Sequence, residues 1–178
     1  SFQINSLGAN ADQKGSVKSR IVELVKDGQG KKKSREWLPK RAQFVISTPM
    51  SLVVQSFELP PIGTQCHVVL NPERQQLAVF DAPLNAWATV ERLAVAKGYT
   101  ISGLYFTHGH WDHTLDGARF NEAGIRTFAH GEDRLFFESP EIMAAFSMPG
   151  LEMPAVAIDE WLVDGQTIEI AGTTAEVR

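Results

Sequence analysis

Three histidines and one aspartate lie within six consecutive residues of this 178-residue chain, at His108, His110, Asp112 and His113. Imidazole nitrogens and carboxylate oxygens are ligands that suit zinc and, less exclusively, iron or manganese. In an extended segment, His108 and His110 point to the same side and can hold one ion. Asp112 and His113 come where the chain turns into the next helix and can face a second ion, while Gly109 lets the backbone bend between the ligands. The spacing therefore predicts a metal site with two ions.

Two ions in one site indicate a hydrolase. They lower the pKa of a bridging water towards neutrality, so that hydroxide becomes available near neutral pH, and they polarise a carbonyl or phosphoryl oxygen. As a ligand, Asp112 can orient that hydroxide and later pass its proton to the leaving group, so we assign the catalytic role to Asp112. We assign no residue to an organic cofactor.

The elements that must position this segment alternate between strand and helix patterns. The apolar run at residues 101–107 directly precedes it and predicts a buried strand, and the end of such a strand is where α/β folds place their sites. The whole order, β-β-β-α-β-α-β-α-β-β, predicts a mixed α/β sandwich. The expected strands are 51–57, 66–70, 77–80, 101–107, 126–129, 167–170 and 174–177, and the expected helices are 83–98, 118–123, 132–137 and 141–146.

The charge divides the chain into two parts. Residues 1–49 carry ten Lys or Arg against four Asp or Glu, whereas residues 50–178 carry seven against seventeen. We therefore predict a domain over 50–178 preceded by a basic N-terminal extension, with a short amphipathic helix at 17–25. We interpret the extension as a solvated tail or linker. Nucleic-acid binding is the alternative, but the acidic domain would repel a phosphate backbone.

The composition also bears on compartment. Cys66 is the single cysteine of the sequence, which excludes an intramolecular disulfide and a zinc cluster built from cysteines. There is no apolar run of about eighteen residues that could span a membrane, and the first residues lack the pattern of a signal peptide. We expect a soluble protein in a reducing, cytoplasmic compartment.

The segment at residues 108–113 is similar to the H-x-H-x-D-H signature of the metallo-β-lactamase superfamily. The resemblance covers roughly residues 50–178 and implies the αβ/βα sandwich, of which this chain would hold the N-terminal half. It implies a dinuclear zinc site in which His108 and His110 bind the first ion, and Asp112 and His113 the second. It also places Asp81, just before the first helix, in the outer shell, where it steadies the ligands.

Within that superfamily the chain resembles the glyoxalase II-like hydrolases, the hydroxyacylglutathione hydrolases. Trp111 and the run Arg126-Thr127-Phe128-Ala129-His130 carry this finer resemblance. It implies a small thioester substrate, such as S-lactoylglutathione, or a related ester. The chain departs from the usual pattern after the last histidine, where Thr114-Leu115-Asp116-Gly117 stands in place of a Gly-Gly sequence.

The family's remaining ligands have no counterpart in the sequence. The first ion needs a third histidine, and the second needs a bridging carboxylate and a further histidine, yet His130 is the one histidine after His113. We therefore expect that the C-terminal part of the domain is lacking and that the chain binds metal weakly. This leaves two alternatives open, a non-catalytic metal-binding fragment or pseudoenzyme, and a hydrolase of this superfamily acting on a lactone, a β-lactam or a phosphodiester.

Other residues with reactive or apolar side chains receive structural interpretations. We predict that His67 is a sheet residue, that Cys66 is a buried strand thiol, that Asp116 interacts with the dipole of the next helix, and that His130 lies in the second shell or at the surface. For one apolar group, a substrate pocket and core or lid packing are equally supported: Phe136, Phe137, Met143, Phe146 and Met148.

Overall fold

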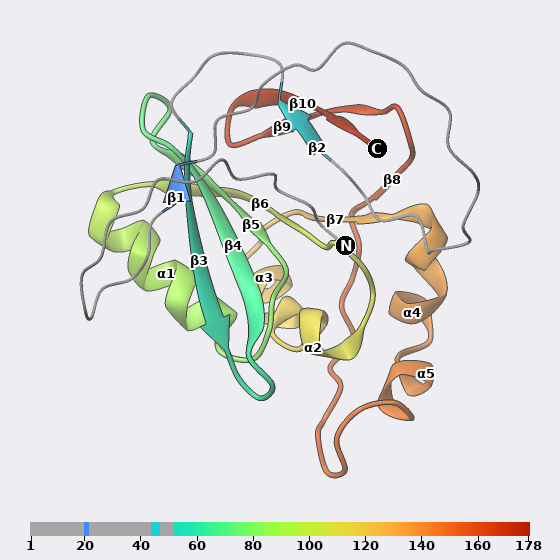
Figure 1. The fold of residues 1–178 in the computed structure, drawn as a ribbon. Coiled ribbons are helices and arrows are strands. Elements are labelled where there is room, and N and C mark those ends of the chain that lie inside the picture. Colours follow the sequence, from blue (N-terminus) through green and yellow to red (C-terminus); the bar gives the residue numbers. More distant parts are fainter. Residues whose placement is uncertain (1–19, 22–43, 47–51) are drawn as a thin grey trace.

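The computed structural model describes residues 20–21, 44–46 and 52–178 (Figure 1). The described elements are β1 Arg20–Ile21, β2 Phe44–Ile46, β3 Val53–Leu59, β4 Thr64–Asn71, β5 Gln76–Phe80, α1 Ala86–Lys97, β6 Thr100–Tyr105, α2 Trp111–Thr114, α3 Gly117–Glu122, β7 Thr127–His130, the 3-10 helix η1 Gly131–Asp133, α4 Arg134–Glu138, α5 Pro140–Ala144, β8 Glu160–Leu162, β9 Thr167–Ile170 and β10 Thr173–Val177.

The described strands form two sheets. The larger has the order β1-β3-β4-β5-β6-β7-β8 and the smaller has the order β2-β10-β9. Neighbours from β1 to β5 are antiparallel, whereas β5, β6, β7 and β8 are parallel. The consecutive strands β4–β5 and β9–β10 form antiparallel hairpins, and α1 makes the crossover between the parallel strands β5 and β6.

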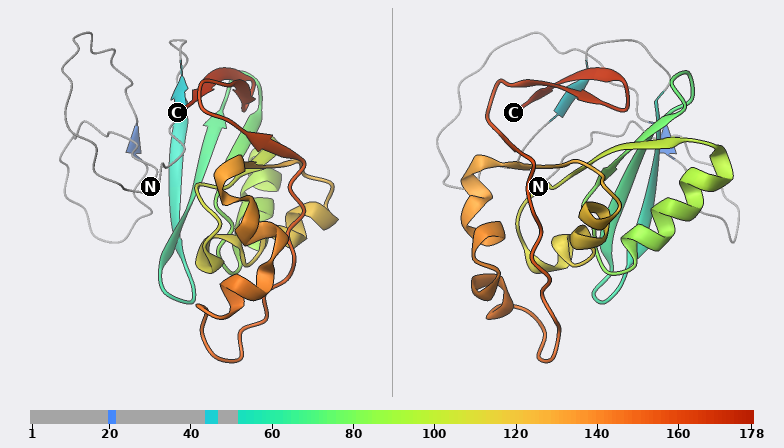
Figure 2. Two further views of the ribbon diagram at one scale, coloured as in Figure 1. Left: turned by 90° about the vertical axis from the view of Figure 1, so that its right-hand side faces the viewer. Right: turned by 180° about the vertical axis from the view of Figure 1, so that it is seen from behind.

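Side chains alternate between the two faces of the larger sheet. Val68 and Val79 point to one face and pack against α1 and α3, whereas Val69 and Ala78 point to the other and pack against β9 and β10. In Figure 1, α1 runs along the strands and the β9–β10 hairpin lies at their upper end. The views from the front and from behind place α4 and α5 at the opposite side of the molecule from α1 (Figures 1 and 2). The predicted mixed α/β architecture is thus confirmed.

The structure corrects the expected elements at three places. A helix was predicted over residues 17–25, and residues 20 and 21 are the part of it that the structure describes. They form β1 and pair with β3, because strand pairing outweighs a short helical pattern. The remainder of that helix and the other expectations for residues 1–49 lie outside the described residues. The described residues 44–46 form β2, which pairs with β10 and was not predicted. The prediction also lacked α2 and β8, which are four and three residues long and too short for a periodic signal.

In the part of the chain that the structure describes, every helix is too short or too polar to cross a lipid bilayer.

Candidate metal centre

The histidine-rich segment lies at one edge of the larger sheet. Asp81 follows β5, the loop at 106–110 follows β6, and His130 ends β7. Parallel strands have their carboxyl ends at the same edge, so these residues come together there. Because β4 runs antiparallel to β5, its first half lies at this edge too and brings Thr64 and His67 towards the segment. The topology thus gathers residues from four strands.

The four predicted ligands lie close together. The ring centroids of His108 and His110 are 4.4 Å apart, and those of His108 and His113 are 4.1 Å apart. Nε2 of His113 is 3.4 Å from Oδ2 of Asp112. Nevertheless, among the described residues no three His, Cys, Asp or Glu side chains adopt an arrangement that could hold a metal ion. The donors therefore adjoin one another without forming a closed set.

Asp81 is the centre of the hydrogen bonds behind these ligands. It is 2% exposed and has a left-handed backbone with φ of 63°. Its carboxylate accepts the backbone N–H of Thr107 at 2.8 Å and the Thr107 hydroxyl at 2.8 and 3.0 Å. Its Oδ2 also lies 2.8 Å from Nδ1 of His113. One buried carboxylate thus holds the end of β6 and one of the predicted ligands.

These bonds define which ring nitrogen carries the proton. An ionised carboxylate only accepts, so Nδ1 of His113 donates to Asp81 and the lone pair lies on Nε2. The hydroxyl of Thr107 donates to Asp81, so it accepts from Nδ1 of His108 at 2.8 Å. With the proton on Nδ1, the neutral form of each ring has its lone pair on Nε2, and that is the form in which an imidazole binds a metal.

Thr64 makes an equivalent contact to the carboxylate ligand. Its buried hydroxyl donates to Oδ2 of Asp112 at 2.6 Å, from the first residue of β4. The sequence prediction did not include Thr64, because 48 residues separate it from Asp112 and only the strand register brings the two together. Thr107 was equally unassigned, although its place just before the predicted ligands, at the end of the apolar run 101–107, was a usable signal.

The donor chemistry of this cluster fits a transition metal. His108 and His113 have their Nδ1 protons held by neighbouring oxygens, and Thr64 fixes one oxygen of Asp112. Such hydrogen bonds orient metal ligands. A closed zinc site takes four donors, or three with water, so the pairs found here are fewer than one complete site requires.

The other reactive side chains of β4 have structural roles, as predicted. Cys66 is fully buried, and burial, followed by the charges of Asp81 and Asp116, raises the pKa of its thiol. His67 lies within the sheet with Nδ1 2.7 Å from the Ser56 hydroxyl. Burial lowers the pKa of His67, while Asp81 raises it and His113 lowers it further. His67 therefore lies near enough to the Asp81–His113 pair to respond to its charge.

Asp116 and His130 bond to helix starts. Oδ2 of Asp116 accepts the backbone N–H of Trp87 at 2.7 Å, at the beginning of α1, and makes no side-chain cap on α3, the helix that we expected it to favour. Burial raises the pKa of Asp116, against the opposing effects of the Trp87 bond and Arg119. His130 is half-buried, and its Nδ1 accepts the backbone N–H of Glu132 at 3.3 Å.

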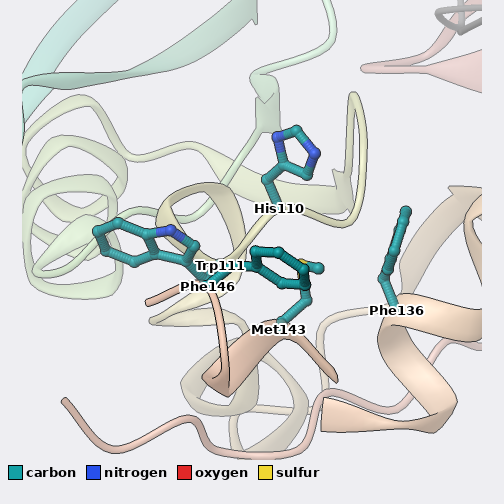
Figure 3. A pocket seen from close by; sticks show the side chains of 5 residues that line it. All are labelled: His110, Trp111, Phe136, Met143 and Phe146. Atoms are coloured by element: carbon teal, nitrogen blue, oxygen red, sulfur yellow. The ribbon is translucent and has the colours of Figure 1, made fainter. Parts of the chain in front are cut away.

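An apolar pocket of about 310 Å³ lies beside the ligands (Figure 3). Its lining residues are His110, Trp111, Phe136, Met143 and Phe146. The sequence left two interpretations open for five apolar residues, a substrate pocket or packing in the core or a lid. Three of the five, Phe136, Met143 and Phe146, line this pocket. Phe137 instead belongs to the core, where its ring centroid is 5.1 Å from that of Phe106, and Met148 is exposed.

No protein-family model and no curated protein matches the chain, but solved structures do. The BLEG-1 B3 metallo-β-lactamase gives a TM-score of 0.57 at 22% identity, over 68% of this chain and 58% of that one. A Cronobacter sakazakii metallo-β-lactamase gives 0.52 at 21%, over 69% and 49%. BJP-1, a subclass B3 enzyme of Bradyrhizobium japonicum, gives 0.50 at 23%, over 69% and 46%. The chain thus spans about half the length of the structures it matches. At these identities the likeness concerns the fold alone.

Proposed function

On the premise of this metallo-β-lactamase-like fold, we propose that the chain carries the metal-binding segment of a metal-dependent hydrolase. The observation that supports the proposal is the meeting of His108, His110, Asp112 and His113 at the carboxyl edge of the parallel strands. The hydrogen bonds of Asp81 add to it, because they hold the donors in the form that binds a metal.

Each residue has a defined task in this proposal. His108 and His110 hold one ion, and Asp112 and His113 hold a second, with zinc preferred over iron or manganese. Such an ion supplies Lewis acidity, which lowers the pKa of water and polarises the carbonyl to be attacked. Asp112 takes up a proton and passes it to the leaving group.

The residues around the ligands hold protons in place. Asp81 holds the proton on Nδ1 of His113, and Thr107 holds the one on Nδ1 of His108. Thr64 donates to one oxygen of Asp112, which limits the rotation of that carboxylate. These contacts reduce the reorganisation that the site requires on binding.

The substrate that we propose is a small thioester or related ester. The glyoxalase II-like features of the sequence, Trp111 and the run at residues 126–130, support this choice. The departure at residues 114–117 concerns the α2–α3 segment and leaves the four ligands untouched.

A second candidate is a metal-binding module without catalytic activity. It is favoured by one observation, that no three donors of the described residues adopt a metal-holding arrangement. In the first candidate, the missing donors come from outside the described residues or from a second polypeptide. The two candidates therefore differ in whether the protein hydrolyses a substrate. Both bind metal through the segment at residues 108–113.

The test is to measure metal content by elemental mass spectrometry and thioester hydrolysis on one sample of the 178-residue chain. His108→Ala is the informative variant, and His130→Ala is its matched control outside the segment. Loss of both metal and hydrolysis in His108→Ala alone supports the hydrolase. Metal lost in that variant, with hydrolysis undetected in every sample, supports the non-catalytic module. Hydrolysis unchanged in His108→Ala contradicts the proposal.

A further inference from the structure

The pocket beside His110 differs in character from the ligand cluster that it adjoins. Its walls are aromatic and aliphatic, and one of them, the imidazole of His110, belongs to the ligand segment. Figure 3 shows Trp111 and Phe136 at opposite sides of the view, with Met143 and Phe146 between them. A volume of about 310 Å³ lies at the lower end of the range for small-molecule pockets, roughly 300–1,000 Å³.

One wall of the pocket, Phe136, packs closely against the ligand loop. A Cβ atom added to Gly109 would lie 2.6 Å from Cβ of Phe136, so only glycine permits this approach of α4 to the ligand loop. The backbone N–H of Gly109 also bonds to the carboxylate of Asp133. The segment between His108 and His110 is thereby fixed against the element that carries the aromatic wall.

Among the described residues, no lysine or arginine lines the pocket. Arg134, on the same helix as Phe136, is directed elsewhere, with its guanidinium 4.6 Å from the centre of the Trp161 ring and 3.1 Å from a Glu138 oxygen. The carboxylates of a glutathione group would find no counter-charge on these walls. A hydrocarbon group would instead remove Phe146, which is 73% exposed, from water.

We propose that this pocket binds a neutral hydrocarbon group of the substrate, placing the ester or thioester carbonyl beside His110. The inference rests on the proposed function, since it takes the 108–113 segment as the reacting centre. It narrows the substrate class from thioesters and esters in general to those with an apolar acyl or alcohol part.

Trp111 gives a readout that needs no catalysis. A neutral medium-chain alcohol with a terminal bromine quenches indole fluorescence on contact, and the chain is studied with a chelator so that metal plays no part. We expect saturable quenching that disappears in Trp111→Phe. Phe146→Ala should weaken binding about tenfold, the effect of losing one partly buried aromatic contact. Leu135→Ala, at an exposed apolar residue of α4 that does not line the pocket, should leave the affinity unchanged.

Several results would overturn the inference. They are an absence of quenching, quenching that persists in Trp111→Phe, and an equal effect of Phe146→Ala and Leu135→Ala. Because Phe146 is exposed, its replacement does not disturb the core, and thermal unfolding checks this. Failure of the hydrolase proposal leaves the quenching result valid. Conversely, hydrolysis whose kcat/KM is unchanged when the acyl part is lengthened and also when the alcohol or thiol part is lengthened contradicts the pocket assignment and supports the hydrolase.

Discussion

The carboxylate of Asp81 connects two of the three histidines in the ligand segment. It bonds directly to His113 and, through the hydroxyl of Thr107, to His108. Its left-handed backbone, with φ of 63°, is one that Asp and Asn adopt more readily than most residues. A single residue at the end of β5 therefore controls the proton positions of two potential ligands.

Asp81→Asn tests this control. Asparagine suits the backbone but brings an NH₂ group to partners that are themselves donors, the N–H of Thr107 and Nδ1 of His113. We expect zinc affinity to fall about 10–100-fold, the usual effect of losing such a contact, as measured by competition with a chromophoric chelator.

The matched control for that measurement is Asp159→Asn. Asp159 accepts the N–H and hydroxyl of Thr127 at 2.8 and 3.0 Å, the same pattern of bonds that Asp81 makes with Thr107. Its carboxylate bonds to Thr127 on β7 and not, among the described residues, to the segment at residues 108–113, so its replacement should leave zinc affinity unchanged. Equal affinities in Asp81→Asn and the unmodified chain would disprove the role of Asp81.

His67 predicts how stability depends on pH. Burial lowers its pKa, so below the ordinary histidine value of about 6.5 the unfolded chain takes up a proton that the folded chain does not. The free energy of unfolding should therefore fall as the pH drops from about 7 to 5. His67→Gln keeps a polar partner for Ser56 and should flatten this decline. Urea unfolding at both pH values, with a chelator present, measures the change.

His130→Gln provides the comparison for His67. His130 is half-buried as well, and at the end of β7 it lies outside the β3–β4 pair that holds His67, so we expect its variant to keep the slope of the unmodified chain. Curves of equal slope for His67→Gln and the unmodified chain would show that His67 is not responsible.

At this scale the sequence predicted four ligands but not the residues that hydrogen-bond to them. His108, His110, Asp112 and His113 were identifiable because six consecutive residues contain all four. Thr64 bonds to Asp112 across 48 residues, and that contact depends on the register of β4 against β5. Local spacing contains no information about such a pairing.

Among the elements, α1 depends on a distant side chain for its start. Asn85, the residue before the helix, makes no side-chain cap, whereas Asp116 accepts the N–H of Trp87 at 2.7 Å. A negative charge at this end of a helix also interacts favourably with the helix dipole. Asp116 thus connects α1 to the segment that follows the ligands.

Replacing Asp116 should therefore destabilise the fold without removing a ligand. Asp116→Ala is expected to lower the free energy of unfolding by about 1–2 kcal/mol, the usual effect of losing a helix cap, and Asp116→Asn by less because its oxygen still accepts. Urea unfolding gives both values. Glu122→Ala removes an exposed carboxylate from α3 and should change stability little. Similar losses in the Ala variants at 116 and 122 would contradict the capping role.

The long helix α1 was easier to predict from the sequence than the short strands β1 and β8. The twelve residues of α1 carry buried Ala86, Val90 and Ala94 at intervals of four, and Gly98 ends the helix with φ of 67°. Such a pattern is legible in one sequence. By contrast, β1 and β8 have two and three residues and exist through their partners β3 and β7. The residues of these two strands do not by themselves indicate that they pair with β3 and β7.

On the scale of the whole molecule, the larger sheet has apolar cover on both faces. The helices cover the face that includes Val79, and the smaller sheet covers the face that includes Tyr105. The Tyr105 hydroxyl donates to the backbone carbonyl of Glu169 at 2.7 Å and so connects the two sheets. The β9–β10 hairpin covers this second face because its alternate residues, such as Ile168 and Ile170, are apolar and buried.

In a chain packed in this way, metal binding can be measured as an increase in thermal stability. An ion that binds the folded chain better than the unfolded one adds about 1.4 kcal/mol for each tenfold rise in its concentration above Kd. For a chain of this size that is a rise in Tm of about 3–6 °C per tenfold of zinc. Magnesium, which prefers oxygen ligands, should have little effect. Since the ligands at residues 108–113 are proposed to bind only in the folded state, His108→Ala should abolish the zinc dependence and His130→Ala should preserve it. A Tm that is independent of zinc, or that rises equally in His108→Ala, would place the metal elsewhere or nowhere in this chain.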